Sequence, residues 1–308
     1  MNSISIRNKI KSDKINRWLS AQMRITFMIA LILIIAAPIV NAATSFEVKI
    51  FGKGEPMILI PGISCSGDVW KSTVVHYEGQ YECHVLTLAG FAGVPPIESD
   101  WFLDQVKNDL IAYIKENHLK KPIVIGHSMG GFIALWMAAT EPDLLGKIII
   151  VDALPFLPAA FYPNATPQTS APFANQLKQK LLSQSDEQFR QNQQANFRML
   201  ITDTVTADAA SKWGEASDKA TVAEVTYEMQ TIDLREEVAK IKSPALIFAT
   251  WIEYKPAQTH DGIAAVFNAQ YVQLKNYRLF VDDNARHFVM LDDPAGFLSE
   301  VDSFLTND

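Results

Sequence analysis

Residues 123–131 read Ile-Val-Ile-Gly-His-Ser-Met-Gly-Gly, an apolar run that ends in a G-x-S-x-G motif and continues into small and apolar residues. An apolar strand, a tight turn and a helix are the context in which this motif presents a reactive serine. Glycine is needed at 126 and 130 because a Cβ at either position would clash in so tight a turn. The stretch therefore predicts a mostly parallel α/β sheet with Ser128 at the carboxyl edge of a strand.

Apolar runs of strand length alternate with helical patterns on both sides of this stretch, as is typical of parallel βαβ units. Helices are predicted over 101–118, 132–140 and 296–305, and Asp100 or Ser99 is placed to cap the first. Strands are predicted over 46–51, 57–60, 84–88, 123–126, 148–151, 246–249 and 278–281.

Residues 153–243 break this alternation. Proline-punctuated loops lead into polar, amphipathic helical patterns over 175–182, 187–200, 207–213 and 221–229, with no strand pattern. We interpret 153–243 as a helical cap over a site, inserted into an α/β core made of 43–152 and 244–308.

The N-terminus has the pattern of a secretory signal. Six basic residues and one acid precede or flank a 16-residue apolar run, 25–40, which is followed by Asn41-Ala42-Ala43. The run is short for a membrane span, which needs about 20 apolar residues. The sequence therefore predicts a signal peptide over 1–42, a periplasmic or secreted protein, and no stable membrane span after cleavage.

Composition narrows the classes of partner. The chain has 308 residues, of which 48% are hydrophobic and 20% charged, which is typical of a globular protein. The chain has 27 basic and 34 acidic residues, and 21 basic and 33 acidic residues remain after residue 42. This net negative charge disfavours a nucleic-acid partner.

There is no HExxH motif or paired Cys/His spacing, so neither a metal nor a cofactor is expected. Cys65 and Cys83 fall near opposite edges of the predicted sheet and are expected to stay free. The oligomeric state is not specified.

A serine hydroxyl needs a base to become a nucleophile. His287 follows the last predicted strand and precedes the final helix, and we favour it over His260. His127 is fixed beside Ser128 and is predicted to support the turn. The developing oxyanion needs two backbone N–H donors. Met129, directly after the serine, supplies one, and Ile63, in the turn that ends the strand over 57–60, is predicted to supply the other.

With these residues in place, the chain resembles the α/β-hydrolase superfamily, specifically its capped serine hydrolases of the esterase and proline-iminopeptidase-like branch. The resemblance rests on Pro61-Gly62, the turn at 126–131, the insertion before Pro244 and His287-Phe288. Relatives usually have His-Gly where this chain has Pro61-Gly62, a tolerated change because the donors there are main-chain groups. The resemblance implies an α/β-hydrolase fold, a mostly parallel central sheet flanked by helices with a helical cap.

The same resemblance leaves two positions for the acid that orients the histidine. Most relatives carry it after the strand that follows the cap, where this chain has Glu253. A minority carry it at the end of the preceding strand, where this chain has Asp152. We favour Asp152, because Glu253 lies in a turn without the usual glycine, and Asp261 is a more distant third.

The sequence thus predicts an exported serine hydrolase that cleaves a small-molecule carboxylic ester through an acyl-enzyme on Ser128. One alternative is a proline-iminopeptidase-like aminopeptidase, in which Asp186, Glu187 or Glu215 of the cap would hold the substrate's amino group. Another is a non-catalytic binding module on the same fold.

Overall fold

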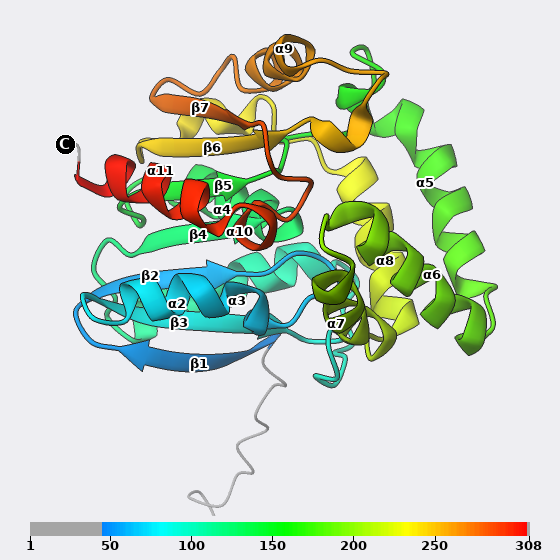
Figure 1. The fold of residues 1–308 in the computed structure, drawn as a ribbon, viewed down its shortest axis with the longest axis horizontal. Helices are drawn as coiled ribbons and strands as arrows, with labels where there is room; N and C mark the ends of the chain where they lie inside the picture. Colours follow the sequence, from blue (N-terminus) through cyan, green and yellow to red (C-terminus); the bar gives the residue numbers. More distant parts are fainter. Residues whose placement is uncertain (1–44, 307–308) are drawn as a thin grey trace, which may run out of the picture. The chain divides into compact units, whose positions relative to one another are not determined.

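The computed structural model describes residues 45–306, so the predicted signal peptide, 1–42, lies outside the described residues. Seven strands form one sheet in the order β1-β3-β2-β4-β5-β6-β7 (Figure 1). Only β1 is antiparallel to its neighbour, β3, and the other neighbouring pairs are parallel. The strands are β1 (Phe46–Gly52), β2 (Glu55–Ile60), β3 (Tyr81–Leu88), β4 (Ile123–His127), β5 (Ile148–Val151), β6 (Ala245–Thr250) and β7 (Tyr277–Asp282).

Helices cover both faces of the sheet, which is why the central strands are apolar along their length. Met57 and Leu59 of β2 pack with α2 (Lys71–Tyr77), α10 (Val289–Asp292) and α11 (Pro294–Thr306). Ile58 and Ile60 alternate with them and pack with the opposite layer, formed by α3 (Phe102–Glu116), α4 (Met129–Thr140) and α9 (His260–Gln270). The predicted α/β-hydrolase fold is confirmed by this architecture.

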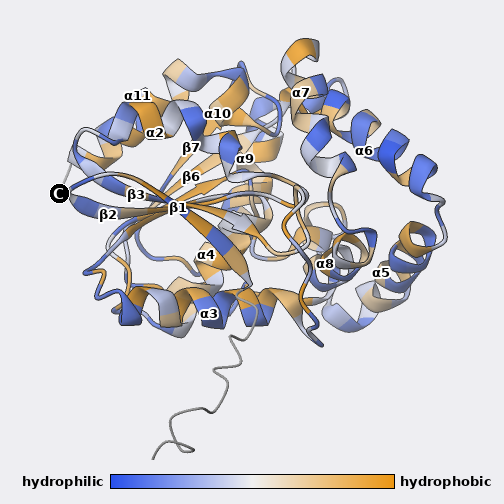
Figure 2. Cartoon of the chain, turned by 90° about the horizontal axis from the view of Figure 1, so that it is seen from below, coloured by the Kyte–Doolittle hydropathy of each residue, from blue (hydrophilic) through white to orange (hydrophobic). Residues whose placement is uncertain are grey.

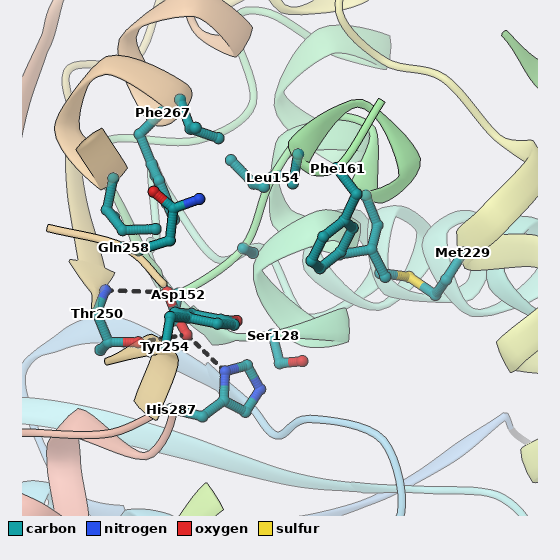
Figure 3. A pocket seen from close by; sticks show the side chains of 15 residues that line it. Ser128, Asp152, Leu154, Phe161, Met229, Thr250, Tyr254, Gln258, Phe267 and His287 are labelled. Atoms are coloured by element: carbon teal, nitrogen blue, oxygen red, sulfur yellow. Dashed lines mark hydrogen bonds and ion pairs between the residues drawn. The ribbon is translucent and has the colours of Figure 1, made fainter. Parts of the chain in front are cut away.

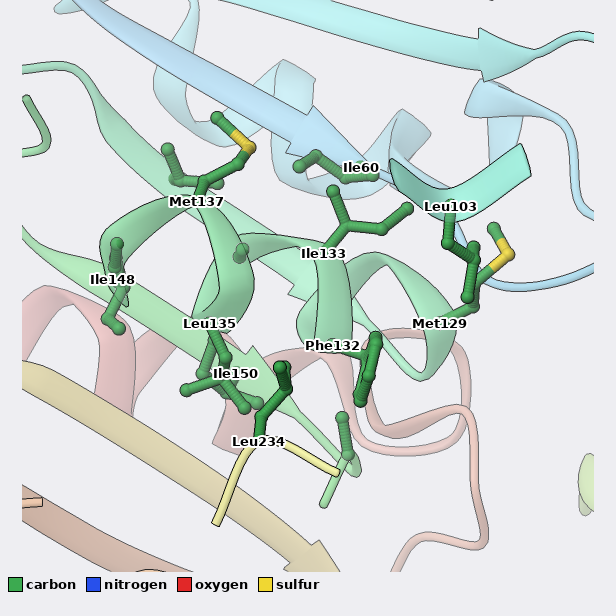
Figure 4. Packing of buried hydrophobic residues seen from close by; sticks show 14 of the residues in the cluster. Ile60, Leu103, Met129, Phe132, Ile133, Leu135, Met137, Ile148, Ile150 and Leu234 are labelled. Atoms are coloured by element: carbon green, nitrogen blue, oxygen red, sulfur yellow. The ribbon is translucent and has the colours of Figure 1, made fainter. Parts of the chain in front are cut away.

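The helix that follows Ser128 is anchored deep in this core. Phe132, Ile133 and Leu135 of α4 are fully buried and pack in the cluster that contains Ile60 and Ile150 of the sheet (Figure 4). The burial of each of these side chains stabilises the folded state by about 1.5–3 kcal/mol. This packing fixes the start of α4, and therefore the turn at Ser128, against the sheet.

Four helices connect β5 to β6, where the sequence predicts the cap. They lie beyond the end of the sheet at which the parallel strands finish (Figure 1), with α5 packed against α8 and α6 against α7. Figure 2 shows that α6 is mostly hydrophilic. Among residues 45–306, no helix combines the length and the apolar character needed to cross a bilayer. The four helices are α5 (Pro167–Leu182), α6 (Asp186–Leu200), α7 (Thr204–Glu215) and α8 (Lys219–Thr231).

The sequence-based prediction that Asp100 or Ser99 caps the N-terminus of α3 is wrong. Trp101, not Asp100 or Ser99, precedes the helix, and its side chain cannot accept a hydrogen bond from the first turn. The acceptor comes from α8 instead. Buried Glu228 accepts the N–H of Phe102 at 2.7 Å and that of Leu103 at 2.8 Å. Because helix N-termini have unpaired N–H groups and a positive partial charge, this carboxylate ties α8 to the core.

We predict that Glu228 makes stability depend on pH. Burial raises the pKa of Glu228 to about 7, above the usual value of 4.5. The folded chain therefore binds more protons than the unfolded chain between pH 4.5 and 7, and the free energy of unfolding falls as pH rises through this window. Denaturant unfolding at pH 5 and at pH 7.5 measures the difference.

A substitution separates this contribution from that of the other titrating groups. Glu228→Gln should lower the free energy of unfolding by about 1–3 kcal/mol, because an amide can accept only one of the two N–H bonds. It should also flatten the pH dependence. Glu116→Gln, at the exposed end of α3, is the matched control. If the free energy of unfolding of Glu228→Gln changes with pH as much as that of the wild type, Glu228 is not the group responsible for the pH dependence.

The two cysteines are buried and free, as the sequence predicts. Cys83 lies opposite Met57 at the start of β2, whereas Cys65 lies beyond the carboxyl end of the same strand. The length of the strand therefore separates the two thiols.

Candidate active site

The turn between β4 and α4 holds Ser128 in a strained backbone conformation, with φ 52° and ψ −119°. Two glycines make this turn possible. A Cβ at Gly126 would lie 2.3 Å from the carbonyl oxygen of Gly130, and a Cβ at Gly130 would lie 2.3 Å from that of Ile60. Neither position admits a side chain, so the geometry matches the sharp strand-to-helix turn that the G-x-S-x-G motif predicts.

His287 lies in the loop between β7 and α10, beside Ser128 (Figure 3). Its Nδ1 is 2.6 Å from Oδ2 of Asp152, the residue that follows β5. Asp152 has φ 48°, a left-handed conformation that a non-glycine residue rarely adopts. The chain thus brings Ser128, His287 and Asp152 together from three separate elements at the carboxyl edge of the sheet.

Thr250, the last residue of β6, holds Asp152 in place. Its backbone N–H donates to Oδ1 of Asp152 at 3.2 Å, and its hydroxyl lies 2.9 Å from Oδ2 (Figure 3). Both oxygens of Asp152 therefore lie within hydrogen-bond distance of Thr250, which fixes the orientation of the carboxyl group towards His287. Thr250 is not among the residues that the sequence predicts for the site. Its position at the end of the strand that neighbours Asp152 is the signal that could have identified it.

Glu253 does not bond to His287 but joins the network through Thr250. The Thr250 hydroxyl lies 2.9 Å from Oε1 of Glu253 as well as 2.9 Å from Asp152. A hydroxyl carries one proton, so both contacts are hydrogen bonds only if a carboxyl group supplies a second. Burial, followed by the charge of Asp152, raises the pKa of Glu253, so Glu253 holds a proton more readily than an exposed glutamate does.

Asp152, Glu253 and His287 each place one possible metal-ligand atom within 4.8 Å of the others. His287 bonds to Asp152, and both carboxyl groups lie within hydrogen-bond distance of the Thr250 hydroxyl. These contacts account for the positions of the three side chains.

His127 supports the loop that carries His287. Its Nε2 donates to the carbonyl oxygen of His287 at 3.0 Å, and its ring packs 4.5 Å from that of Phe288. Burial, followed by the charge of His287, holds the pKa of His127 well below its usual range. This low pKa keeps His127 neutral, and its hydrogen bond supports the loop of His287 rather than the turn at Ser128 that the sequence predicts it to support.

The two backbone N–H groups predicted to bind the oxyanion belong to residues close to Ser128. Met129 is the first residue of α4, and Ile63 lies in a turn closed by the N–H of Cys65 donating to the carbonyl of Gly62 at 3.2 Å. Within residues 45–306, neither the N–H of Met129 nor that of Ile63 has a hydrogen-bond acceptor. A Cβ at Gly62 would come within 3.3 Å of the Ser128 side chain, so glycine lets this turn approach the serine.

Two cavities meet at Ser128 and His287. The first, which we name the apolar cavity, has a volume of about 230 Å³ and is mostly hydrophobic (Figure 3). The second, which we name the polar cavity for its amide side chains, has a volume of about 480 Å³, is lined largely by α5 and α6, and also exposes more apolar than polar surface. The apolar cavity is lined by Leu154, Leu157, Phe161, Met229, Ile263, Val266 and Phe267, among others. The polar cavity includes Ile63, Ser64, Lys180, Gln184, Asn192, Gln193, Asn196 and Thr226.

The other candidate residues lie away from this junction. His260 begins α9 and contacts the exposed Asp261 at 3.1 Å, and neither lines either cavity. The three cap acids are paired elsewhere: Asp186 with Lys219, Glu187 with Arg190 and Glu215 with Lys212.

Comparison with known proteins identifies the class. The model of the alpha/beta hydrolase family matches residues 57–300, and the chain belongs to this family. Similar solved structures include a hydrolase from Pseudomonas aeruginosa PA01 (TM-score 0.71, 15% identity, 85% of this chain and 94% of that one). An esterase from Exiguobacterium antarcticum gives a TM-score of 0.70 at 15% identity over 85% of this chain and 96% of its own. These likenesses show the fold.

The proteins that are similar to this chain in sequence are named as esterases. A pimeloyl-[acyl-carrier protein] methyl ester esterase of Aliivibrio fischeri (strain MJ11) is 25% identical over 265 residues, which cover 85% of this chain and 98% of the relative. The corresponding esterase of Aeromonas hydrophila is 30% identical over 148 residues, 47% of this chain and 56% of the relative. The chain thus belongs to the alpha/beta hydrolase family and is similar in sequence to ester hydrolases of this family.

Proposed function

We propose that the protein is a serine carboxylesterase that forms an acyl-enzyme on Ser128. The observation that carries this proposal is the meeting of Ser128, His287 and Asp152 at the junction of two cavities, beside two unpaired N–H groups. The curated relatives, which are named as ester hydrolases, support the same reaction class.

In this mechanism Ser128 Oγ attacks the ester carbonyl while Nε2 of His287 takes the hydroxyl proton. Asp152 orients the imidazole through Nδ1 and stabilises the imidazolium that forms. The N–H groups of Ile63 and Met129 bind the oxyanion. His287 then gives its proton to the departing alcohol oxygen. Water, deprotonated by His287, cleaves the acyl-enzyme in the second half of the reaction and releases the acid.

Hydrolysis of p-nitrophenyl esters from acetate to palmitate tests this function on the chain that starts at Ala43. We expect turnover that is lost in Ser128→Ala, with an optimum at short acyl chains if the acyl group occupies the small apolar cavity. A folded wild-type protein that hydrolyses none of these esters, and none of the alkyl esters described below, would contradict the proposal.

The aminopeptidase alternative has less support. Holding a substrate's amino group requires a carboxylate on the cavity wall, but the described residues that line the two cavities include only one, Asp152, which is bonded to His287. The predicted cap acids are paired with lysine or arginine away from Ser128. Absence of turnover with proline arylamides is the expected result.

We predict that the acidic limb of the pH–rate profile lies above pH 6.5. Burial lowers the pKa of His287, but the hydrogen bond and charge of Asp152 raise it by more, so that it lies above 6.5. Only neutral His287 can accept the serine proton, so kcat/KM should rise as pH increases through this raised pKa. Measurement of kcat/KM with p-nitrophenyl butyrate from pH 5 to 9 gives the midpoint, and a midpoint below 6.5 would contradict the prediction.

We also propose export of the protein, on the basis of the basic and apolar pattern of residues 1–42. Fractionation of cells that express the full chain, with N-terminal sequencing of the product, tests this proposal. Intact residues 1–42 on protein that remains inside the cell would contradict it.

A further inference from the structure

We propose that the polar cavity binds a hydrogen-bonding arm of the ester substrate, of the amide-bearing class, while the apolar cavity binds a shorter hydrocarbon arm. This inference rests on the proposed function and specifies its substrate. An ester has two substituents, and both cavities include Ser128 and His287 in their walls. An ester held at Ser128 can therefore extend one arm into each cavity.

The wall of the polar cavity contains amide groups with no protein partner. Gln193 of α6 is only 5% exposed, yet its side-chain amide has no hydrogen bond to any residue within 45–306. Gln184, in the loop before α6, has a fully buried Oε1 that also lacks a donor in the described part of the chain. The Gln193 amide is therefore free to bond to a ligand in the cavity, and a hydrogen bond of this kind contributes about 0.5–1.5 kcal/mol.

The chemistry of the wall specifies the class of arm. Asn192 and Asn196 add two further amides, and Lys180 adds an ammonium group, while none of the described residues lining this cavity is a carboxylate. Primary amides both donate and accept, so they match the C=O and N–H of a secondary amide. These amides and the ammonium group therefore favour an arm with carbonyl oxygens over a cationic group.

The apolar cavity carries fewer polar side chains. Away from the catalytic groups its wall is formed mainly by Leu154, Phe161, Met229 and Phe267, with Tyr254 and Gln258 as polar members, and its volume is about half that of the polar cavity. A hydrocarbon arm buries apolar area against the first four side chains. The difference in amide side chains and in volume gives the substrate a direction across Ser128.

Two pairs of matched esters test the inference, because either the acyl or the alcohol arm can occupy the polar cavity. The first pair is 2-acetamidoethyl butyrate and pentyl butyrate. The second is propyl 4-acetamidobutanoate and propyl heptanoate. Each pair differs by an amide in place of hydrocarbon, and titration of the released acid gives kcat and KM. We expect kcat/KM for the amide ester to exceed that for its partner by about 10-fold in at least one pair.

Substitution of the unpaired glutamine assigns the effect to the cavity. Gln193→Met keeps the side-chain volume nearly constant but removes the amide. It should lower kcat/KM of the preferred amide ester by about 3- to 10-fold and change that of the hydrocarbon ester by less than about 2-fold. Gln184→Met should act in the same direction. Gln194→Met, at the next position of α6 but outside the cavity wall, is the matched control and should change neither ester.

The outcomes separate this inference from the proposed function. The inference is overturned if Gln193→Met lowers kcat/KM equally for both esters of a pair. It is also overturned if the wild-type kcat/KM is no higher for the amide ester than for the hydrocarbon ester in either pair. Hydrolysis of pentyl butyrate that disappears in Ser128→Ala would then leave the esterase proposal standing. No hydrolysis of any of the four esters, or of the p-nitrophenyl esters, would overturn both.

Discussion

Ser128→Ala is expected to reduce ester turnover by at least about 10⁴-fold while leaving the fold intact. The hydroxyl is the proposed nucleophile, and no other hydroxyl in the described residues occupies the strained turn with φ 52° at the start of α4. Alanine removes one oxygen from a half-buried site and introduces no clash. The rate is measured with the best p-nitrophenyl ester.

The control for this prediction is the stability of the variant. Its free energy of unfolding should equal that of the wild type or exceed it slightly, because the remaining contacts of the turn are made by the backbone. The backbone N–H at position 128, for example, donates to the carbonyl of Val151 at 2.8 Å. A folded Ser128→Ala protein that retains a tenth of the wild-type rate would contradict the mechanism.

Asp152→Asn is expected to lower kcat by about 10³- to 10⁴-fold. The amide removes the negative charge 2.6 Å from His287 Nδ1, and its NH₂ group no longer selects the tautomer that leaves Nε2 free to accept the serine proton. Glu253→Gln alone should change kcat by less than about 3-fold, because Asp152, not Glu253, bonds to His287 and the amide can still pair with the Thr250 hydroxyl. Steady-state rates at pH 8 measure both variants.

The double variant separates the roles of the two acids. Asp152→Asn removes the charge that raises the pKa of Glu253, so Glu253 ionises more readily and places a negative charge near His287. Adding Glu253→Gln to Asp152→Asn should therefore reduce the remaining rate by a further factor of about 10, far more than it does in the wild type. If Glu253→Gln alone is as damaging as Asp152→Asn, Glu253 is the acid of the triad and our assignment is wrong.

The fold was predictable because its signals are local. Each predicted strand is present, extended by a few residues in most cases, because a strand covered on both faces must be apolar along its length. The turn at Ser128 was predictable for a different reason. Gly126 and Gly130 stand where a Cβ would lie 2.3 Å from a backbone oxygen, so the sequence carries the constraint directly.

Other features depend on contacts between distant segments. Glu228 caps a helix that begins 126 residues earlier in the chain, and no local pattern reveals that pairing. The choice between Asp152 and Glu253 was open because β5 and β6 are neighbours and end at the same edge. Only the side-chain positions show that Asp152 bonds to His287 and that Thr250 separates it from Glu253.

The cavities were not predictable for a related reason. The sequence shows that α5 and α6 are amphipathic, but not which polar residues face Ser128. Gln193 is one of many glutamines in this region, and its burial arises from the packing of α6 against α7. The polar character of the second cavity therefore emerges only from the tertiary structure.

The central claim, an activated nucleophile at Ser128, is tested most directly by covalent labelling with a fluorophosphonate. The wild-type chain from Ala43 should gain one adduct by intact mass, and peptide mapping should place it on Ser128. Labelling should be lost in Ser128→Ala and become much slower in His287→Ala, because the hydroxyl then lacks its base. A folded wild-type protein that takes up no label, or that is labelled at another residue, would contradict this account.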